Sequence, residues 1–132
     1  MNNKLEDDNY CFVCGEKNRH GLDLRFSFNN GTVSVEFIPE KIHQGYKDIV
    51  HGGIISTLVD EAMVKAAIMQ GISAVTAEIT VRFRNPLMVG EKATVSASIT
   101  KINKRIIETS ASLRKADDTL IAEGHAKLLR YD

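Results

Sequence analysis

The sequence has few of the features that mark secreted, membrane-spanning or nucleic-acid-binding proteins. Its 17 basic residues balance 17 acidic ones, so no global field draws in nucleic acid or an anionic membrane. The first ten residues lack the positive flank and apolar run of a secretory signal. Charged residues interrupt every apolar stretch well short of the roughly 20 residues that span a bilayer. We therefore expect a cytoplasmic protein that binds neither nucleic acid nor membrane.

Cysteine is also scarce: the only two are Cys11 and Cys14, in the run CFVCG. A four-ligand zinc site needs a second pair of ligands, and the remaining candidates are four scattered histidines. A thioredoxin-like dithiol begins a helix after a strand, whereas this pair precedes any clear element. The sequence thus favours neither a metal site nor a redox role for these cysteines.

Size and composition are those of one domain. A chain of 132 residues with 43% hydrophobic content can bury a core without disulfides or metals. No internal repeat or low-complexity linker divides the chain. We expect a single domain over residues 1–132, with a loose polar segment at 1–10.

Hydrophobic alternation with a period of two predicts a sheet. Leu22 to Phe28 and Thr32 to Phe37 alternate on either side of an Asn-Asn-Gly turn, which is typical of a hairpin. Four further strands are predicted later in the chain, separated by Pro86, Gly90 and two polar turns. Their ranges are Ala74 to Phe83, Ala93 to Lys101, Ile106 to Leu113 and Leu120 to Leu129.

One segment between these strands carries a helical signal. The run from Ile54 to Gln70 has no proline or glycine, is rich in helix formers and ends before Gly71, a typical C-cap. Apolar residues surround almost its whole circumference, so we expect the helix to be mostly buried. A hairpin, one buried helix and four strands predict an α+β fold in which an antiparallel sheet wraps around a central helix.

The chemistry is expected around this helix. His51, Gly52 and Gly53 stand at its entrance, where free backbone N–H groups favour negative charge and can polarise a thioester carbonyl. Asp60 follows about two turns later among apolar residues, where an unpaired carboxylate is costly. An active-site role is one explanation, and an ion pair or a solvent-exposed position is the other. Glu61 points about 100° away from Asp60, so the two are not expected to form a catalytic dyad.

These motifs resemble the hotdog-fold thioesterase superfamily, in its small 4-hydroxybenzoyl-CoA and phenylacetate-pathway branch. The likeness covers most of the chain and rests on Cys14-Gly15 with Asn18 and Gly21-Leu22, on HQGY followed by VHGG, on the helical acid and on VRFRNPLMVGE. The resemblance implies a hotdog fold and an enzyme that hydrolyses a small or medium acyl-CoA thioester to the free acid and CoA.

By matching position, the resemblance implies individual roles. A reactive carboxylate falls on Asp60, as nucleophile or as the base that activates water, and a carbonyl-polarising amide falls on Gly52. His51 and Gly53 shape that turn, and Thr76 lies near a position where some members carry a water-orienting hydroxyl.

This chain departs from the family pattern in the loop before His51. Many members carry an Asn or Gln where this chain has Gly45, and Gln44 stands one residue earlier. A small difference in loop length would bring Gln44 to the substrate thioester.

Substrate and partners follow from the same resemblance. CoA is expected as part of the substrate, with no other cofactor and no metal, and the site is expected between two subunits of a homodimer or homotetramer. Alternating arginines on a strand are often just an exposed face, but arginine also suits phosphate. The predicted phosphate contacts are Arg82, Arg84, Lys101, Lys104 and Arg105.

Two other functions stay open. Hotdog hydratases and dehydratases use a histidine with a carboxylate, which His51 and Asp60 or Glu61 would supply. A non-catalytic acyl-CoA-binding module would use the same fold without turnover.

Overall fold

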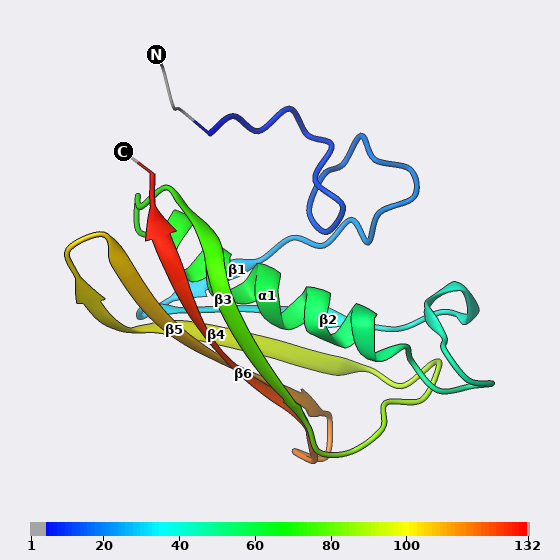
Figure 1. The fold of residues 1–132 in the computed structure, drawn as a ribbon. Helices are drawn as coiled ribbons and strands as arrows, with labels where there is room; N and C mark the ends of the chain where they lie inside the picture. Colours follow the sequence, from blue (N-terminus) through cyan, green and yellow to red (C-terminus); the bar gives the residue numbers. More distant parts are fainter. Residues whose placement is uncertain (1–4, 132) are drawn as a thin grey trace.

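The strands lie where hydrophobic residues repeat every two residues, and the helix lies where the repeat is about 3.6 residues. Figure 1 shows the order of these elements along the chain. The computed structural model describes residues 5–131. Its elements are β1 (Ser27–Asn29), β2 (Thr32–Phe37), a 3-10 turn (Lys41–His43), α1 (Gly52–Ile68), β3 (Ala74–Phe83), β4 (Ala93–Asn103), β5 (Ile106–Lys115) and β6 (Leu120–Arg130). No helix in this part of the chain is long and apolar enough to cross a membrane.

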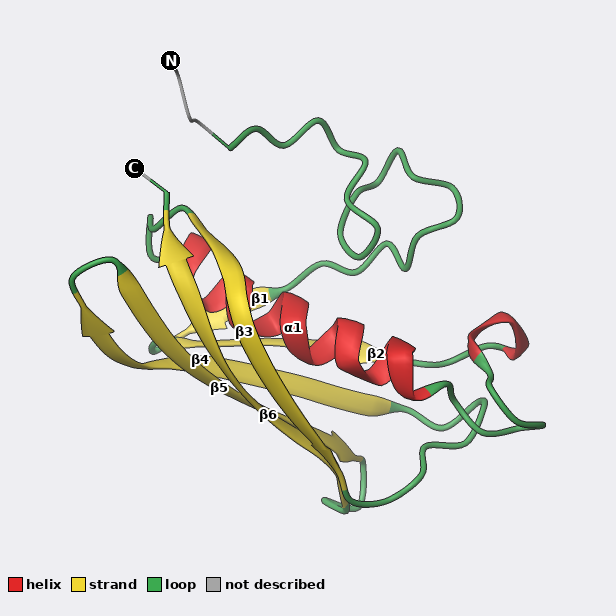
Figure 2. Ribbon diagram, in the orientation of Figure 1, coloured by secondary structure: helices red, strands yellow, loops and turns green. Residues whose placement is uncertain are grey.

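The strands form one antiparallel sheet in the order β1-β2-β4-β5-β6-β3. The sheet curves around α1, which packs on its inner face (Figure 2). This is the α+β arrangement of one helix wrapped by an antiparallel sheet that the sequence predicts. The order leaves β3 at one edge of the sheet, next to the helix.

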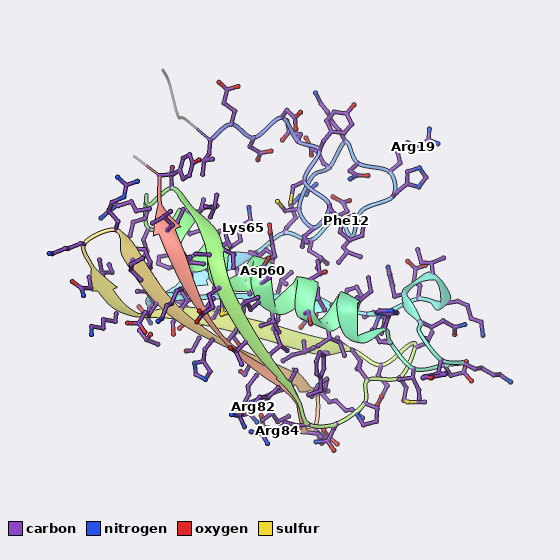
Figure 3. The ribbon with its side chains drawn as sticks, viewed as in Figure 1. Phe12, Arg19, Asp60, Lys65, Arg82 and Arg84 are labelled. Atoms are coloured by element: carbon purple, nitrogen blue, oxygen red, sulfur yellow. The ribbon has the colours of Figure 1, made fainter. Side chains whose placement is uncertain are left out.

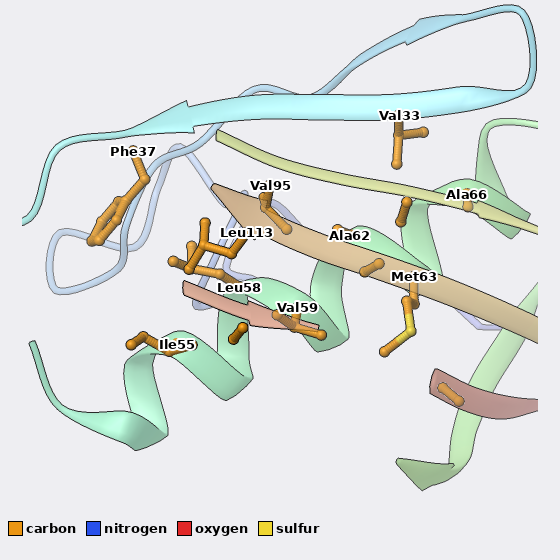
Figure 4. Packing of buried hydrophobic residues seen from close by; sticks show 14 of the residues in the cluster. Val33, Phe37, Ile55, Leu58, Val59, Ala62, Met63, Ala66, Val95 and Leu113 are labelled. Carbon is orange, nitrogen blue, oxygen red and sulfur yellow. The ribbon is translucent and has the colours of Figure 1, made fainter. Parts of the chain in front are cut away.

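Residues of the helix and of the inner sheet face form the core (Figure 4). Leu58, Val59 and Met63 are fully buried against strand residues such as Val95 and Leu113. Each large side chain of this kind contributes about 1.5–3 kcal/mol when it leaves water. The seven buried residues of α1 lie on one stripe of the helix, the two glycines at the start and Ile68 at the end are exposed, and the other residues are half-buried. The prediction of a mostly buried helix is therefore confirmed only in part.

The N-terminal alternation was misleading as a strand signal. Only Ser27–Asn29 pairs in the sheet, although the pattern predicts a strand over 22–28. Leu22 and Leu24 instead donate their backbone N–H groups to the carbonyls of Phe12 and Val13, and Asp23 has a φ of 52°. The apolar side chains of this stretch still pack against the core, which produces the alternation without a strand.

Other boundaries differ by small amounts. The helix begins at Gly52 rather than Ile54, and its C-cap is Met69; Gly71 follows with a φ of 81°. The hairpin between β1 and β2 forms as predicted, because Asn30 and Gly31 both adopt positive φ. Residues 5–10 contain no helix or strand, and residues 1–4 of the segment predicted to be loose lie outside the described residues.

Candidate active site

The entrance of α1 presents one free backbone donor. His51 is the N-cap, and its Nδ1 accepts a hydrogen bond from the Gly53 N–H at 2.8 Å. Within residues 5–131 the Gly52 N–H donates to no acceptor, and this residue is exposed. The first turn of a helix carries partial positive charge, so the Gly52 N–H is placed to bind an oxygen that gains negative charge. His51 therefore shapes the turn, as the resemblance implies.

The structure brings Asp60 and Thr76 together. Figure 3 labels Asp60 in the middle of α1. The Thr76 hydroxyl, in the first part of β3, donates to Asp60 Oδ1 at 2.6 Å. Both residues are partly buried. The register of β3 against β6 shifts between Thr76 and Glu78, and a bulge of this kind re-aims a side chain. Among residues 5–131, Asp60 is thus neither ion-paired nor fully open to solvent: a neutral hydroxyl holds one of its oxygens.

The Gly52 N–H and the Asp60 carboxylate lie on one helix but not at one point. Eight residues separate them, which corresponds to about 12 Å along an α-helix. A thioester carbonyl carbon cannot lie within contact distance of both groups of a single chain. The two groups therefore belong to two different places in one chain, joined by the rigid helix.

Gln44 lies beside the helix entrance, where it lines a hollow of about 370 Å³ with His51, Gly53 and Thr57. Its side-chain oxygen accepts a hydrogen bond from the Asp48 N–H at 3.0 Å. The loop thus uses the carbonyl end of the amide, and the NH₂ end makes no hydrogen bond within the described residues. Gln44 therefore lies beside the helix entrance, and its role as the family's amide stays a prediction.

The predicted phosphate-binding residues fall into two groups rather than one. Arg82 pairs in register with Glu123 on β6, whereas Ile106, next to Arg105, pairs with Leu129. Six residues along β6 separate these levels, which is about 20 Å. One phosphate group can contact only one of the two groups.

The individual basic residues differ in how they are held. Arg84 donates to Glu123 Oε1 at 2.6 Å, and this hydrogen bond lowers the pKa of the Glu123 carboxyl. Arg105 donates to the carbonyl of Arg130, and Lys104 occupies the turn between β4 and β5 with a φ of 58°. Arg82 is exposed and makes no hydrogen bond or salt bridge within residues 5–131. Among the three predicted arginines it is therefore the one whose guanidinium no hydrogen bond of the described residues holds in place.

The apolar side chains near the helix entrance differ in how far they are buried. Leu58 and Met63 are fully buried core residues, whereas Ile54 borders the hollow beside Gln44. Phe83 is 55% exposed and lies next to Gly52, where a Cβ added to the glycine would meet the Phe83 ring at 3.5 Å. Phe83 is thus the side chain that flanks the free amide.

Sequence reasoning missed a second cluster, on another face of α1. Cys11, Cys14 and Glu61 each place one ligand atom within 4.8 Å of the others, and Lys65 lies next to them. Burial raises the pKa of the Cys14 thiol to about 12, helped by its hydrogen bond with Cys11. The 100° turn that separates Glu61 from Asp60 was visible in the sequence, but the position of the cysteine turn was not.

Comparison with known proteins identifies the family. The family model for the thioesterase superfamily matches residues 47–122. Human acyl-coenzyme A thioesterase 13 is 32% identical over 103 residues, 75% of this chain and 74% of the human protein. Acyl-coenzyme A thioesterase THEM4 of Xenopus laevis is 29% identical over 85 residues, 64% of this chain. This chain covers only 38% of that protein, and 39% of the mouse form.

Solved structures share the fold. A thioesterase superfamily protein superimposes with a TM-score of 0.86 at 22% identity, covering 92% of this chain and 60% of the other. The PaaI protein of the E. coli phenylacetic acid degradation operon gives 0.79 at 22% identity, over 84% and 81% of the two chains. With the family model spanning the helix entrance, Asp60 and Thr76, the chain belongs to the thioesterase superfamily.

Proposed function

We propose that this protein is an acyl-CoA thioesterase that uses Asp60 as its reactive carboxylate. The observation that carries the proposal is the hydrogen bond from Thr76 to Asp60, which fixes a partly buried carboxylate on the helix whose first turn offers the free Gly52 N–H. The relatives named acyl-coenzyme A thioesterases support the substrate class. So do the neighbours solved with acetyl-CoA and with coenzyme A.

The proposed reaction is addition and elimination at the thioester carbonyl. Asp60 takes a proton from water as the water oxygen bonds to the carbonyl carbon, or its carboxylate oxygen attacks that carbon directly. The carbonyl oxygen becomes an oxyanion, which accepts a hydrogen bond from the Gly52 N–H. The carbon–sulfur bond then breaks, and the CoA sulfur leaves and gains a proton. The water route releases the free acid at this point, whereas direct attack leaves an acyl–Asp60 anhydride that a water molecule then hydrolyses, which frees the acid and restores the Asp60 carboxylate. Single turnover in ¹⁸O-labelled water tests the direct route, since label in Asp60 itself requires hydrolysis of that anhydride.

Replacing Asp60 with Asn tests the central claim. Asp60→Asn keeps the shape of the side chain but removes the base and nucleophile, so kcat should fall by about 10²–10⁴. Free CoA thiol is measured by its reaction with a disulfide dye, across acyl-CoA substrates of increasing chain length. An Asn variant with wild-type turnover would overturn the mechanism, and a wild-type protein that binds acyl-CoA without releasing thiol would support the non-catalytic alternative.

The active unit is proposed to be a homodimer or a homotetramer. The separation of about 12 Å between the Gly52 N–H and Asp60 requires that one carbonyl be held by Gly52 of one copy and attacked with the help of Asp60 of another. β3 is an edge strand of ten residues, and its exposed Ile79 lies in the middle of that strand. Such an edge is a natural surface for pairing with a second copy.

Mixing two inactive variants tests the shared site. Gly52→Pro removes the amide hydrogen and Asp60→Asn removes the base. If the site is shared, each mixed dimer carries both lesions in one site and none in the other, so mixing should restore about one quarter of the wild-type activity. A site built within one chain gives no recovery after mixing.

A hydratase is the alternative enzyme for this site. A hydratase would need His51 as a proton carrier, but His51 Nδ1 already accepts the Gly53 N–H, which favours hydrolysis. Loss of acyl unsaturation with the thioester intact would support the hydratase instead.

A cytoplasmic location is also proposed, and the two free cysteines are typical of a reducing compartment. Fractionation of cells that express the protein at its natural level tests that location.

A further inference from the structure

The N-terminal segment is long and irregular. Residues 5–26 contain no helix or strand, yet they fold back on themselves over α1 (Figure 1). Backbone hydrogen bonds such as Lys17 N–H to Asn9 O hold the segment in shape. Val13 and Gly15 are its only buried residues among those described. A terminal segment without helix or strand keeps one conformation only where contacts tie it to the rest of the domain.

The contact between this segment and α1 contains three soft or anionic ligand atoms. Cys11 Sγ lies 3.6 Å from Glu61 Oε2, and Cys14 Sγ completes a triangle in which all atoms lie within 4.8 Å of one another. In a tetrahedral zinc site, zinc–sulfur bonds of about 2.3 Å and zinc–oxygen bonds of about 2.1 Å place sulfur and oxygen about 3.6 Å apart. The sulfur–oxygen edge is therefore already at the length that zinc requires.

The cysteine turn is shaped to present both sulfurs on one side. The Cys14 N–H donates to Cys11 Sγ at 3.5 Å, and the Gly15 N–H donates to the Cys11 carbonyl at 2.9 Å. A Cβ at Gly15 would lie 2.4 Å from Cys11 N, so only glycine fits this position. Amide donation to a cysteine sulfur stabilises a metal-bound thiolate, as outer hydrogen bonds do around metal ligands in general.

Charge balance points to a doubly charged ion. Two thiolates and one carboxylate carry three negative charges, and Lys65 Nζ lies 4.0 Å from Glu61 Oε2 with its side chain only 19% exposed. A divalent cation together with Lys65 makes the cluster neutral, which matters at a partly buried site. A neutral water molecule as fourth ligand preserves that balance, whereas a second carboxylate in that position does not.

We propose that Cys11, Cys14 and Glu61 bind one Zn²⁺ ion, with water as the fourth ligand. Thiolates select zinc over hard cations such as Mg²⁺ and Ca²⁺. This proposal departs from the prediction that the protein has no metal, because the sequence search looked for a second cysteine or histidine pair and the third ligand is Glu61. The ion fastens the N-terminal segment to α1 and so acts on stability rather than on the thioester.

Cobalt titration of the full, untagged, phosphine-reduced chain tests the site. One equivalent of Co²⁺ should produce thiolate-to-cobalt charge-transfer bands and the intense visible bands of tetrahedral cobalt, and Zn²⁺ should displace it. Glu61→Gln keeps both cysteines and should weaken binding by at least about tenfold. Glu36→Gln is the matched control, because Glu36 is an exposed carboxylate on β2, and its binding should equal wild type.

Two results would overturn the proposal. The first is the absence of charge-transfer bands in the reduced wild-type protein. The second is equal affinity in wild type and Glu61→Gln, which would leave the contact as a thiol–carboxylate hydrogen bond. A double Cys11→Ser and Cys14→Ser variant should lose the bands entirely; if it fails to fold, the Glu61→Gln comparison still decides.

Discussion

Replacement of Thr76 by Val isolates the hydrogen bond on which the proposed mechanism depends. The two side chains have nearly the same shape, so Val removes the donor to Asp60 Oδ1 and little else. A hydrogen bond to a charged group contributes about 1.5–3 kcal/mol. If that energy holds the carboxylate in its reactive position, kcat should fall by about 10-fold to 150-fold. Because Thr76 acts through Asp60, it is a positioning residue and KM should change little.

Steady-state release of CoA thiol measures the effect, with Thr76→Ser as the matched control. Ser keeps the hydroxyl, so the Ser variant should regain most of the activity that Val loses. A merely structural role would reduce thermal stability in both variants without separating kcat from KM. The reasoning fails if Thr76→Val turns over within about twofold of wild type, a change well below the energy of one hydrogen bond.

Three further predictions rest on other contacts. Gly52→Pro should lower kcat by about 10²–10³ by removing one oxyanion donor, since Pro is tolerated at the first helical position and His51 already has the extended backbone that precedes Pro. Gly52→Ala retains the N–H, meets Phe83 at an ordinary 3.5 Å and should stay active in the same assay. Gly124→Ala should destabilise the fold by about 1–3 kcal/mol in urea denaturation, because its Cβ would lie 2.4 Å from buried Val59 Cγ1. In metal-free protein, the pKa of Cys14 at about 12 instead of 9.0 keeps its thiol protonated. Alkylation of Cys14 at pH 8, measured by mass spectrometry, should therefore be far slower in the folded protein than in the unfolded protein. The unfolded thiol ionises first, so this group should lower the free energy of unfolding as pH rises from 9 toward 12.

Sequence patterns predicted the late strands well because their alternation and their pairing have the same cause. In β5, buried and partly exposed positions alternate from Ile107 to Leu113, so hydrophobicity reports directly on the face of the sheet. The same signal failed over residues 22–26. There the apolar side chains reach the core from an irregular backbone whose hydrogen bonds go to Phe12 and Val13, and no local pattern records such partners.

In the candidate site, too, the sequence predicted some features and only the structure shows others. Position in the helix was enough to single out Asp60 as a costly carboxylate, and family likeness pointed to Thr76, but their 2.6 Å contact depends on a bulge in β3 that the sequence does not reveal. The predicted phosphate contacts stay a prediction, and the sequence does not show how they are grouped. Arg82 and Arg105 are both basic residues near strand ends, and only the register of β6 shows that they lie about 20 Å apart.

The proposed shared site follows from the geometry of one helix. Gly52, the proposed polarising amide, lies in the first turn of α1, and Asp60, the proposed reactive carboxylate, lies in its middle, so the helical rise keeps them about 12 Å apart. A two-fold arrangement of two copies removes the conflict, because it can bring the first turn of one helix to the middle of the other and creates two equal sites at once. In the proposed dimer, the helix length that prevents a single chain from holding one carbonyl would give a symmetric pair two complete sites, and the activity of mixed variants reports directly on that geometry.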